Sequence, residues 1–435
     1  MPTETAAGSA YARVHKSKKS VISATSSISQ IGNLMEENEP VSRIEPCRLE
    51  QIPEALGDVI ADLKAEATQL GNRLAPSTAR ALASLVRAMN TYYSNRIEGH
   101  KTSLREIERA MENDFDEDRR DLQMEARAHM RVQAEIESKF ARSDLEPPTS
   151  VAFIRWLHGE FYRDLPEDLR IIRAKDGRNL LMAPGTFRCP EQDLPGQKTG
   201  VGRHDPPSSH RVEAFMSYFE ERYRLDTMGS SQRIIAMAAA HHRLNFIHPF
   251  YDGNGRVSRL MSHAIGLAAG IGAHGLWSVS RGLARGLASP DEYRAKMEQA
   301  DLTRRNALDG RGNLSQETLI DFVHWFLSVC LDQVRFMGDL FDLDHLRDRL
   351  RLFTVSQGLR PESVGILDEV VIRGEMPRGD ASRASGLPER TARDVLAALV
   401  ANGVLASETP KGPVSLRFPA HVAEIVFPRL YAEAA

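Results

Sequence analysis

Residues 247–260 read IHPFYDGNGRVSRL and hold most of the chemistry that the sequence displays. Pro249 ends the helix expected before this stretch, and Gly253 and Gly255 let the chain turn closely. Several backbone N–H groups can then point the same way at the start of the next helix, where the helix dipole also favours an anion. The pattern predicts a phosphate-binding loop between two helices.

The charged side chains of this stretch suit a nucleotide with several phosphates. Arg256 and Arg259 are three residues apart, so they share one face of the second helix and can each hold a further phosphate. Asp252 offers a hard oxygen ligand for Mg²⁺ on the same phosphates, and His248 can act as a general base near neutral pH. Without a preceding strand and a G-K-[ST] sequence, the stretch does not resemble a Walker A, kinase or Rossmann loop.

The stretch resembles the Fic family motif, H-P-F-x-[D/E]-G-N-G-R-x-x-R, at every defined position. The resemblance implies a mainly α-helical Fic fold and transfer of AMP from ATP to a Ser, Thr or Tyr hydroxyl of a target protein. It implies that His248 is the base, that Asp252 binds Mg²⁺, and that Arg256 and Arg259 contact the β- and γ-phosphates. It also implies an anion hole made by Gly253, Asn254 and Gly255.

A shorter match lies earlier in the chain. Residues 94–99, SNRIEG, resemble the family's inhibitory motif, [S/T]-x-x-x-E-[G/N], in members with the inhibitory helix on the N-terminal side (class II). The resemblance implies an inhibitory helix at about residues 77–98, with Ser94 and Glu98 as its motif residues and Glu98 on Arg259 in place of the γ-phosphate. Because an Arg–carboxylate pair in a partly desolvated cleft competes with an Arg–phosphate pair, we expect low activity in the unmodified protein.

A third match is weaker. Residues 185–188, GTFR, stand where the family has a hairpin flap that aligns the target's backbone by strand addition. The surrounding residues 177–207 contain many Gly and Pro residues, which indicates a short hairpin or a loop. The expected flap residues are Thr186, Phe187 and Arg188.

The remaining sequence predicts four parts. Residues 1–42 have few large apolar side chains, which is typical of a flexible tail, and an N-terminal helical region is expected at 43–150. The Fic core is expected at 151–355. Residues 360–435 follow the order helix, helix, turn, helix, hairpin, which predicts a winged helix-turn-helix domain with 389–401 as its recognition helix. Since this segment is not strongly basic, DNA binding and protein contact both stay open.

Composition limits the other functions. The 435 residues include 56 Lys and Arg against 59 Asp and Glu, so the net charge of -3 predicts no general affinity for nucleic acid or anionic membranes. The cysteines Cys47, Cys189 and Cys330 are far apart, which argues against a disulfide framework or a thiolate zinc site. No apolar run is long enough to span a membrane. We expect a cytoplasmic protein that uses ATP and Mg²⁺ and has no membrane contact.

Two other functions stay open at this point. In one, Glu98 positions a water so that the same site removes AMP from a modified protein. In the other, the protein is a DNA-binding regulator whose Fic core senses a nucleotide, although the intact His248 speaks against this alternative. The sequence does not identify the target protein, the acceptor hydroxyl or the nucleotide donor, and it leaves a homodimer open.

Overall fold

The computed structural model describes residues 39–173, 177–193 and 204–431, so the predicted tail lies almost wholly outside the described residues. The described chain is mainly α-helical, as predicted, with one two-stranded and one three-stranded antiparallel sheet. Among these residues no helix is both long and apolar enough to cross a membrane.

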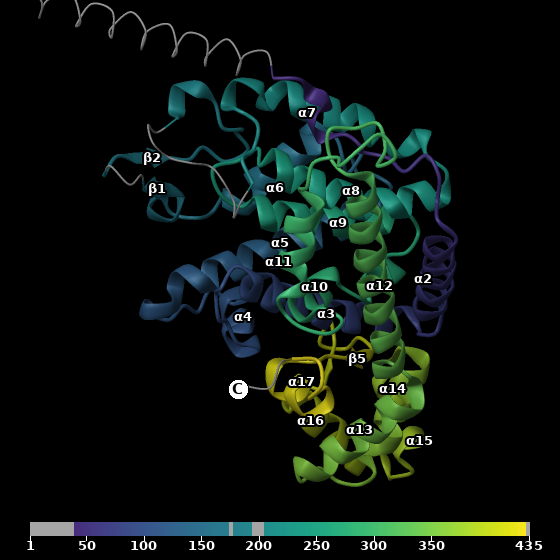
Figure 1. Cartoon of the computed structure of the whole chain (residues 1–435). Coiled ribbons are helices and arrows are strands. Elements are labelled where there is room, and N and C mark those ends of the chain that lie inside the picture. The colour runs from purple at the N-terminus through teal and green to yellow at the C-terminus, as the bar shows by residue number, and fades with distance from the viewer. Residues whose placement is uncertain (1–38, 174–176, 194–203, 432–435) are drawn as a thin grey trace, which may run out of the picture.

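The helices and strands follow one another as shown in Figure 1. The helices are α2 (Glu54–Asn72), α3 (Pro76–Ile97), α4 (Leu104–Met111), α5 (Arg120–Ala141), α6 (Val151–Tyr162), α7 (Val212–Arg222), α8 (Ser230–Ile247), α9 (Asn254–Ala268), α10 (Val279–Arg285), α11 (Glu292–Ala300), α12 (Gln316–Leu340), α13 (Leu343–Ser356), α14 (Ser363–Arg373), α15 (Ala381–Ser385), α16 (Glu389–Ala401) and α17 (Ala420–Val426). The strands are β1 (Ile171–Arg173), β2 (Asn179–Leu181), β3 (Glu375–Met376), β4 (Leu405–Ala406) and β5 (Val414–Leu416).

Local sequence explains both ends of α3. The helix starts at Pro76, whose fixed φ suits a first helical position, and it ends at Ile97. Glu98 is its C-cap, and Gly99 follows with φ +84°, the left-handed conformation that commonly closes a helix. The sequence thus places Glu98 at the last turn of α3, just before the chain changes direction.

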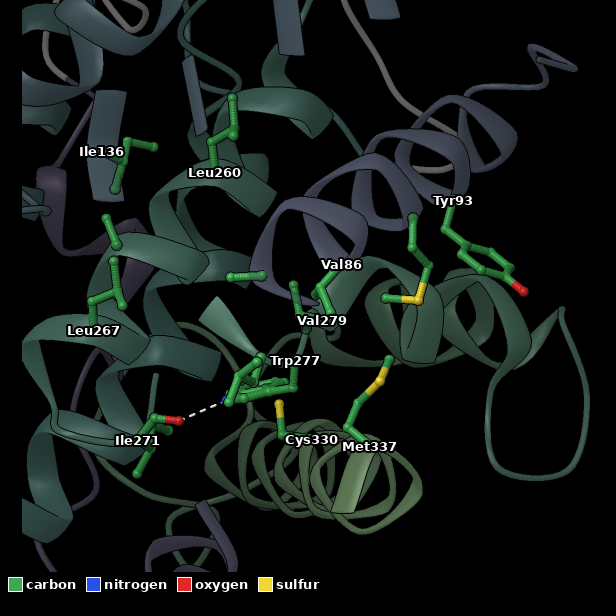
Figure 2. Close-up of a cluster of buried hydrophobic side chains, with 14 of the residues drawn as sticks. Val86, Tyr93, Ile136, Leu260, Leu267, Ile271, Trp277, Val279, Cys330 and Met337 are labelled. Carbon is green, nitrogen blue, oxygen red and sulfur yellow. Dashed lines mark hydrogen bonds between the residues drawn. The ribbon is translucent and has the colours of Figure 1, made fainter. Parts of the chain in front are cut away.

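The core is built from helices that are far apart in sequence. Figure 2 shows side chains of α3, α5, α9, α10 and α12 gathered around Trp277, among them Val86, Leu260 and Cys330. The indole Nε1 of Trp277 donates a hydrogen bond of 2.6 Å to the carbonyl of Ile271. Because this polar atom is paired, the large ring can be buried at little cost. The packing fixes α3 and α9, which carry the two sequence matches, in one core.

The hairpin of the core lies earlier than the flap residues predicted for it. Strands β1 and β2 pair with Ile171 opposite Leu181, so Thr186, Phe187 and Arg188 follow the hairpin instead of forming it. Phe187 and Arg188 are both only 3% exposed and pack against the chain after α8. Residues 194–203 of the expected hairpin or loop region lie outside the described residues, so the flap stays a prediction.

The C-terminal part lies below the core in Figure 1, with α3 between them. Its elements follow the predicted order helix, helix, turn, helix, hairpin, with strand β3 and helix α17 in addition, and its sheet has the order β3-β5-β4. Two hydrogen bonds connect this part to α3: Thr78 Oγ1 donates to the Val371 carbonyl at 3.2 Å, and the Tyr93 hydroxyl donates to the Leu430 carbonyl at 3.3 Å. Helix α3, whose C-cap is Glu98, is therefore held by the core on one side and by the C-terminal part on the other.

Candidate active site

The loop between α8 and α9 is braced from within. His248 caps α8 in the left-handed region, with φ 51°, and its N–H donates to the Leu244 carbonyl at 2.9 Å. The Asn254 side chain accepts from the N–H of Phe250 at 3.0 Å and donates to the Phe250 carbonyl at 2.8 Å. The ring of Phe250 is fully buried and stacks on His158, with ring centroids 3.9 Å apart. The side chain of Asn254 thus holds the loop's shape.

Two glycines leave room that no other residue would leave. Gly253 has φ +79°, and a Cβ at this position would lie 2.8 Å from the Tyr162 hydroxyl. A Cβ at Gly255 would lie 2.7 Å from Glu98 Oε1. Helix α9 is 15 residues long and no side chain caps its N-terminus, so its first N–H groups are free of a side-chain acceptor. This arrangement suits an anion such as phosphate.

We expect Gly253→Ala to destabilise the protein by about 1–3 kcal/mol, because alanine is strained at positive φ and its Cβ would meet Tyr162. Gly57 is the matched control: it lies within α2 and a Cβ there would meet nothing within 4 Å, so Gly57→Ala should be neutral or stabilising. Thermal and urea unfolding midpoints measure both changes. Equal midpoints for the two variants would contradict the steric argument.

Arg259 is 1% exposed and is held by the end of α3. Its Nη2 lies 2.6 Å from Glu98 Oε1, and its Nε donates to Ser94 Oγ at 3.0 Å. Burial acts to raise the pKa of Glu98, but Arg259 and Arg256 outweigh it and hold this pKa below its ordinary value. The carboxylate is therefore ionised at neutral pH, and the ion pair implied by the inhibitory motif is present.

Arg256 is paired with a second carboxylate that the sequence did not single out. Its Nη2 lies 2.9 Å from Glu125 Oε2 on α5, and the same oxygen lies 2.8 Å from His100 Nδ1. The Nε of Arg256 is buried and has no hydrogen-bond partner among the described residues, which leaves one donor for a ligand. Nothing in the charged sequence of α5 distinguishes Glu125 from its neighbours, because only the packing of α5 on α9 brings it here.

Asp252 is half-exposed beside the glycines. Tyr162 donates a hydrogen bond of 2.6 Å to its Oδ2. Burial acts against ionisation, yet the charge of Arg256 and the Tyr162 hydrogen bond keep the pKa of Asp252 below its ordinary value. No group of three metal-ligating side chains occurs among the described residues, so this carboxylate fits Mg²⁺ only where phosphates supply further oxygen ligands.

His248 has the protonation state that a base requires. Burial lowers its pKa to about 4, and Arg188 and His204 act in the same direction. The imidazole is therefore neutral at pH 7 and able to accept a proton. The structure thus brings together the residues predicted at 248–259 with Ser94 and Glu98. Of the predicted flap residues, Phe187 packs its ring against Phe250, and the hydrogen bonds of Arg188 to this loop go to its main chain.

The loop lies in a segment that is similar to a known family. Residues 148–265 match the Fic/DOC family. The matched segment contains the whole loop and ends within α9, whereas Glu98 lies outside it.

The curated relatives share only a short segment with this chain. The protein adenylyltransferase Fic of Drosophila willistoni is 39% identical over 70 residues, which is 16% of this chain and 14% of that protein. The protein of the same name from Drosophila grimshawi gives the same identity over the same coverage. The chain therefore spans about a seventh of the length of these relatives.

Two solved structures also align with the chain. A Fic family protein from Desulfovibrio desulfuricans has a TM-score of 0.48 and 16% identity, with 84% of this chain and 97% of that chain covered. A Fic domain containing signaling protein from Bacteroides thetaiotaomicron has a TM-score of 0.46 and 17% identity, with 64% of this chain and 95% of that chain covered.

Proposed function

We propose that the protein is an autoinhibited protein adenylyltransferase that transfers AMP from ATP to a hydroxyl side chain of a target protein. The observation that carries this proposal is the loop 248–259, which joins a neutral histidine, an uncapped helix start and two buried arginines within the Fic/DOC segment. These groups can bind a polyphosphate and accept a proton, which are the two tasks of nucleotidyl transfer.

In the proposed reaction the hydroxyl oxygen of the target attacks the α-phosphorus of ATP. The new bond joins that oxygen to the α-phosphorus, the bond to the oxygen that bridges the α- and β-phosphates breaks, and pyrophosphate leaves. His248 takes the hydroxyl proton, while the N–H groups at the start of α9 and Arg256 bind phosphate oxygens. Mg²⁺ held by Asp252 would neutralise part of the phosphate charge.

The proposed inhibition acts at Arg259. A γ-phosphate needs this guanidinium, and Glu98 already occupies it at 2.6 Å. Because the pair is charge-assisted and Arg259 is buried, ATP must displace a strong contact before its γ-phosphate can bind productively. The expected state of the unmodified protein is therefore low activity.

The test uses purified protein, Mg²⁺ and ATP labelled at the α-phosphate, with ATP labelled at the γ-phosphate in parallel. We expect protein-bound label from the α-position alone, in Glu98→Gly more than in wild type and absent from Glu98→Gly/His248→Ala. Label from the γ-position would indicate a kinase instead. Absence of label in every variant, with an added cell extract as the source of targets, would reject AMP transfer.

Removal of AMP from a modified protein is the second candidate, and the ionised Glu98 favours it. Its side chain is 31% exposed, so an oxygen of the carboxylate can orient a water. Incubation of an AMP-labelled protein with wild type and Glu98→Gly separates the two functions. Release of AMP by wild type and its loss in Glu98→Gly would support removal.

We also propose that residues 360–435 form a winged helix-turn-helix domain, which the order of α14, α15 and α16 and the sheet β3-β5-β4 support. DNA binding by this domain has weaker support. Arg390 and Arg393 are exposed on α16, but Arg393 pairs with Glu389 at 3.3 Å. Binding of the full chain to duplex DNA that weakens steeply with salt would support a DNA-binding regulator.

His100 provides a further test of the inhibited state. It lies two residues after Glu98 in the sequence, and its contact with Glu125 helps to hold this end of the inhibitory segment in place. We expect His100→Ala to raise basal AMP transfer about two- to fivefold at pH 6, since it removes one polar contact of the inhibitory segment. Initial rates of α-labelling measure this, and His345→Ala is the control because that side chain is 72% exposed.

The effect should depend on pH. The hydrogen bond with Glu125 raises the pKa of His100 above its ordinary value, against the effect of burial, with Glu98 assisting and Arg256 opposing. The charged contact is then complete below the ordinary value of about 6.5 and is lost as the pH rises through the raised value. The ratio of variant to wild-type rates should fall towards one by pH 9. A ratio independent of pH would exclude the protonated histidine.

A further inference from the structure

Arg188 is a buried arginine that binds the end of helix α8. The residue is 3% exposed, its Nε donates to the His248 carbonyl at 2.7 Å, and its Nη2 donates to the Ile247 carbonyl at 3.1 Å and to the Pro207 carbonyl. Its own backbone N–H donates to the Pro249 carbonyl at 2.9 Å. Arg188 thus contacts three consecutive main-chain carbonyls, at residues 247, 248 and 249.

Two of these acceptors, the carbonyls of Ile247 and His248, belong to the end of α8, which leaves them without helical partners. The last carbonyls of α8 have no intrahelical N–H, and they carry the negative end of the helix dipole. Among the described residues, the hydrogen bonds of the Arg188 side chain all go to main-chain carbonyls. Burial lowers the pKa of Arg188 to about 10, so the guanidinium keeps its charge at neutral pH. The charge is therefore compensated by the helix end together with the nearby carboxylates of Asp193 and Glu39.

The peptide that Arg188 holds is the one that orients the histidine. His248 has φ 51° and ψ 60°, a left-handed conformation that is uncommon for residues other than glycine and needs support from its surroundings. Arg188 bonds to the carbonyls of Ile247 and His248, which lie on the two sides of the His248 Cα, and so fixes both peptide planes that flank this Cα. Because the main chain of His248 is fixed, the position of its imidazole depends only on the rotamer of the side chain.

We propose that Arg188 is the positioning residue that locks the main chain of His248 and so aims its imidazole at the acceptor hydroxyl. The expected effect on kcat rests on the proposed AMP transfer, whereas the fixed main chain of His248 does not depend on it. Among the described residues, Arg188 has no hydrogen bond to a residue between Asp252 and Arg259, so we expect it to contribute to proton transfer and not to nucleotide binding. Misplacement of a reacting group by about 1 Å can cost about a hundredfold in rate.

The test compares Arg188→Met, Arg188→Lys and Arg243→Met, each in the full-length Glu98→Gly protein. Methionine keeps the apolar bulk without the donors, and lysine keeps the charge with a different donor geometry. Arg243 is the matched control, because it is fully buried and also donates to main-chain carbonyls, at Pro46 and Ala300, away from the loop. Each protein is measured for kcat and KM for ATP and for its unfolding midpoint.

A second readout does not depend on activity. Histidine labelled with ¹³C at the carbonyl gives a resonance for His248, identified by its loss in His248→Ala, and its shift reports the hydrogen bond from Arg188 Nε. We expect this resonance to move in Arg188→Met and to stay unchanged in Arg243→Met. If Arg188→Met does not fold, Arg188→Lys is measured in the same way.

The expected kinetic result is a fall in kcat of about a hundredfold for Arg188→Met, a smaller fall for Arg188→Lys, and a KM for ATP within about twofold of the parent. An unchanged kcat and an unmoved resonance would overturn the proposal. A loss of activity in Arg243→Met as large as that in Arg188→Met would also overturn it, because it would show a general effect of stability. If no variant transfers AMP but the resonance moves, the proposed reaction fails while the locking of His248 stands.

Discussion

Glu98→Gly should raise the initial rate of AMP transfer about ten- to a hundredfold over wild type. The substitution removes the carboxylate that lies 2.6 Å from Arg259 Nη2 and so frees the guanidinium for a γ-phosphate. Hydrogen bonds to charged groups contribute about 1.5–3 kcal/mol, which corresponds to about this range of rates. Glycine should not disturb the fold, because Glu98 is the C-cap of α3 and not a residue of its interior.

The controls separate the carboxylate from the helix end. Glu98→Gln keeps the size of the side chain without its charge and should give an intermediate rate. Arg96→Gly changes an exposed residue in the last turn of the same helix and should not activate. Rates are taken from incorporation of α-label at ATP concentrations below KM. Activation by Arg96→Gly to the level of Glu98→Gly would mean that loosening α3, and not freeing Arg259, controls the enzyme.

The contacts of α3 indicate how the site could open. Thr78 and Tyr93 bind main-chain carbonyls of the C-terminal part, and Ser94 and Asn95 are fully buried. A movement of the whole helix would expose this buried surface and break these bonds. The last turn is different, because Glu98 is a partly exposed C-cap and is followed by Gly99, where a Cβ would meet nothing within 4 Å. Opening by rearrangement of residues 98–100 therefore costs less than release of α3.

The main helices could be predicted because the sequence marks their ends. Pro76 and Gly99 bound α3, and residues 389–401 form α16 with the bounds predicted. Two short helices, α10 and α17, and strand β3 were missed, since seven or two residues give too little periodicity to recognise. The start of the hairpin was less predictable: the Gly and Pro content indicated a hairpin or loop at 177–207, whereas its first strand begins at Ile171 and only its second strand, β2, lies within that range.

The residues of the site also fall into those that the sequence marks and those that it does not. Residues of the loop were predictable because the glycines, Asp252, Arg256 and Arg259 must be close in space when they are close in sequence. Glu125, Tyr162 and Arg188 could not be found in this way, since each reaches the loop from another element. For Arg188 the sequence signal was present but was assigned to the flap, and only the path of the chain after β2 shows that its side chain turns inward.

His248→Ala in the Glu98→Gly background should lower AMP transfer by about 10²–10⁴-fold, the usual contribution of a positioned general base. ATP binding should change little, because the proposed phosphate contacts belong to residues 253–259. Equilibrium binding of ATP and α-labelling are measured on the same preparations, with His345→Ala as the control for loss of an exposed histidine. A parallel loss of ATP affinity would place His248 in binding instead of proton transfer.

The pH profile of Glu98→Gly tests the same role without changing the histidine. Because burial, Arg188 and His204 lower the pKa of His248 to about 4, the free enzyme holds its base in the neutral form throughout the neutral range. The kcat/KM for labelling should therefore be level from pH 8 to about pH 6 and fall only as the pH approaches that value, since kcat/KM reports the free enzyme. A fall already centred near pH 6.5 would mean that the imidazole is solvated as in an unfolded chain. In that case the hydrogen bonds of Arg188 to the carbonyls of Ile247 and His248 would not be enough to keep the imidazole of His248 buried.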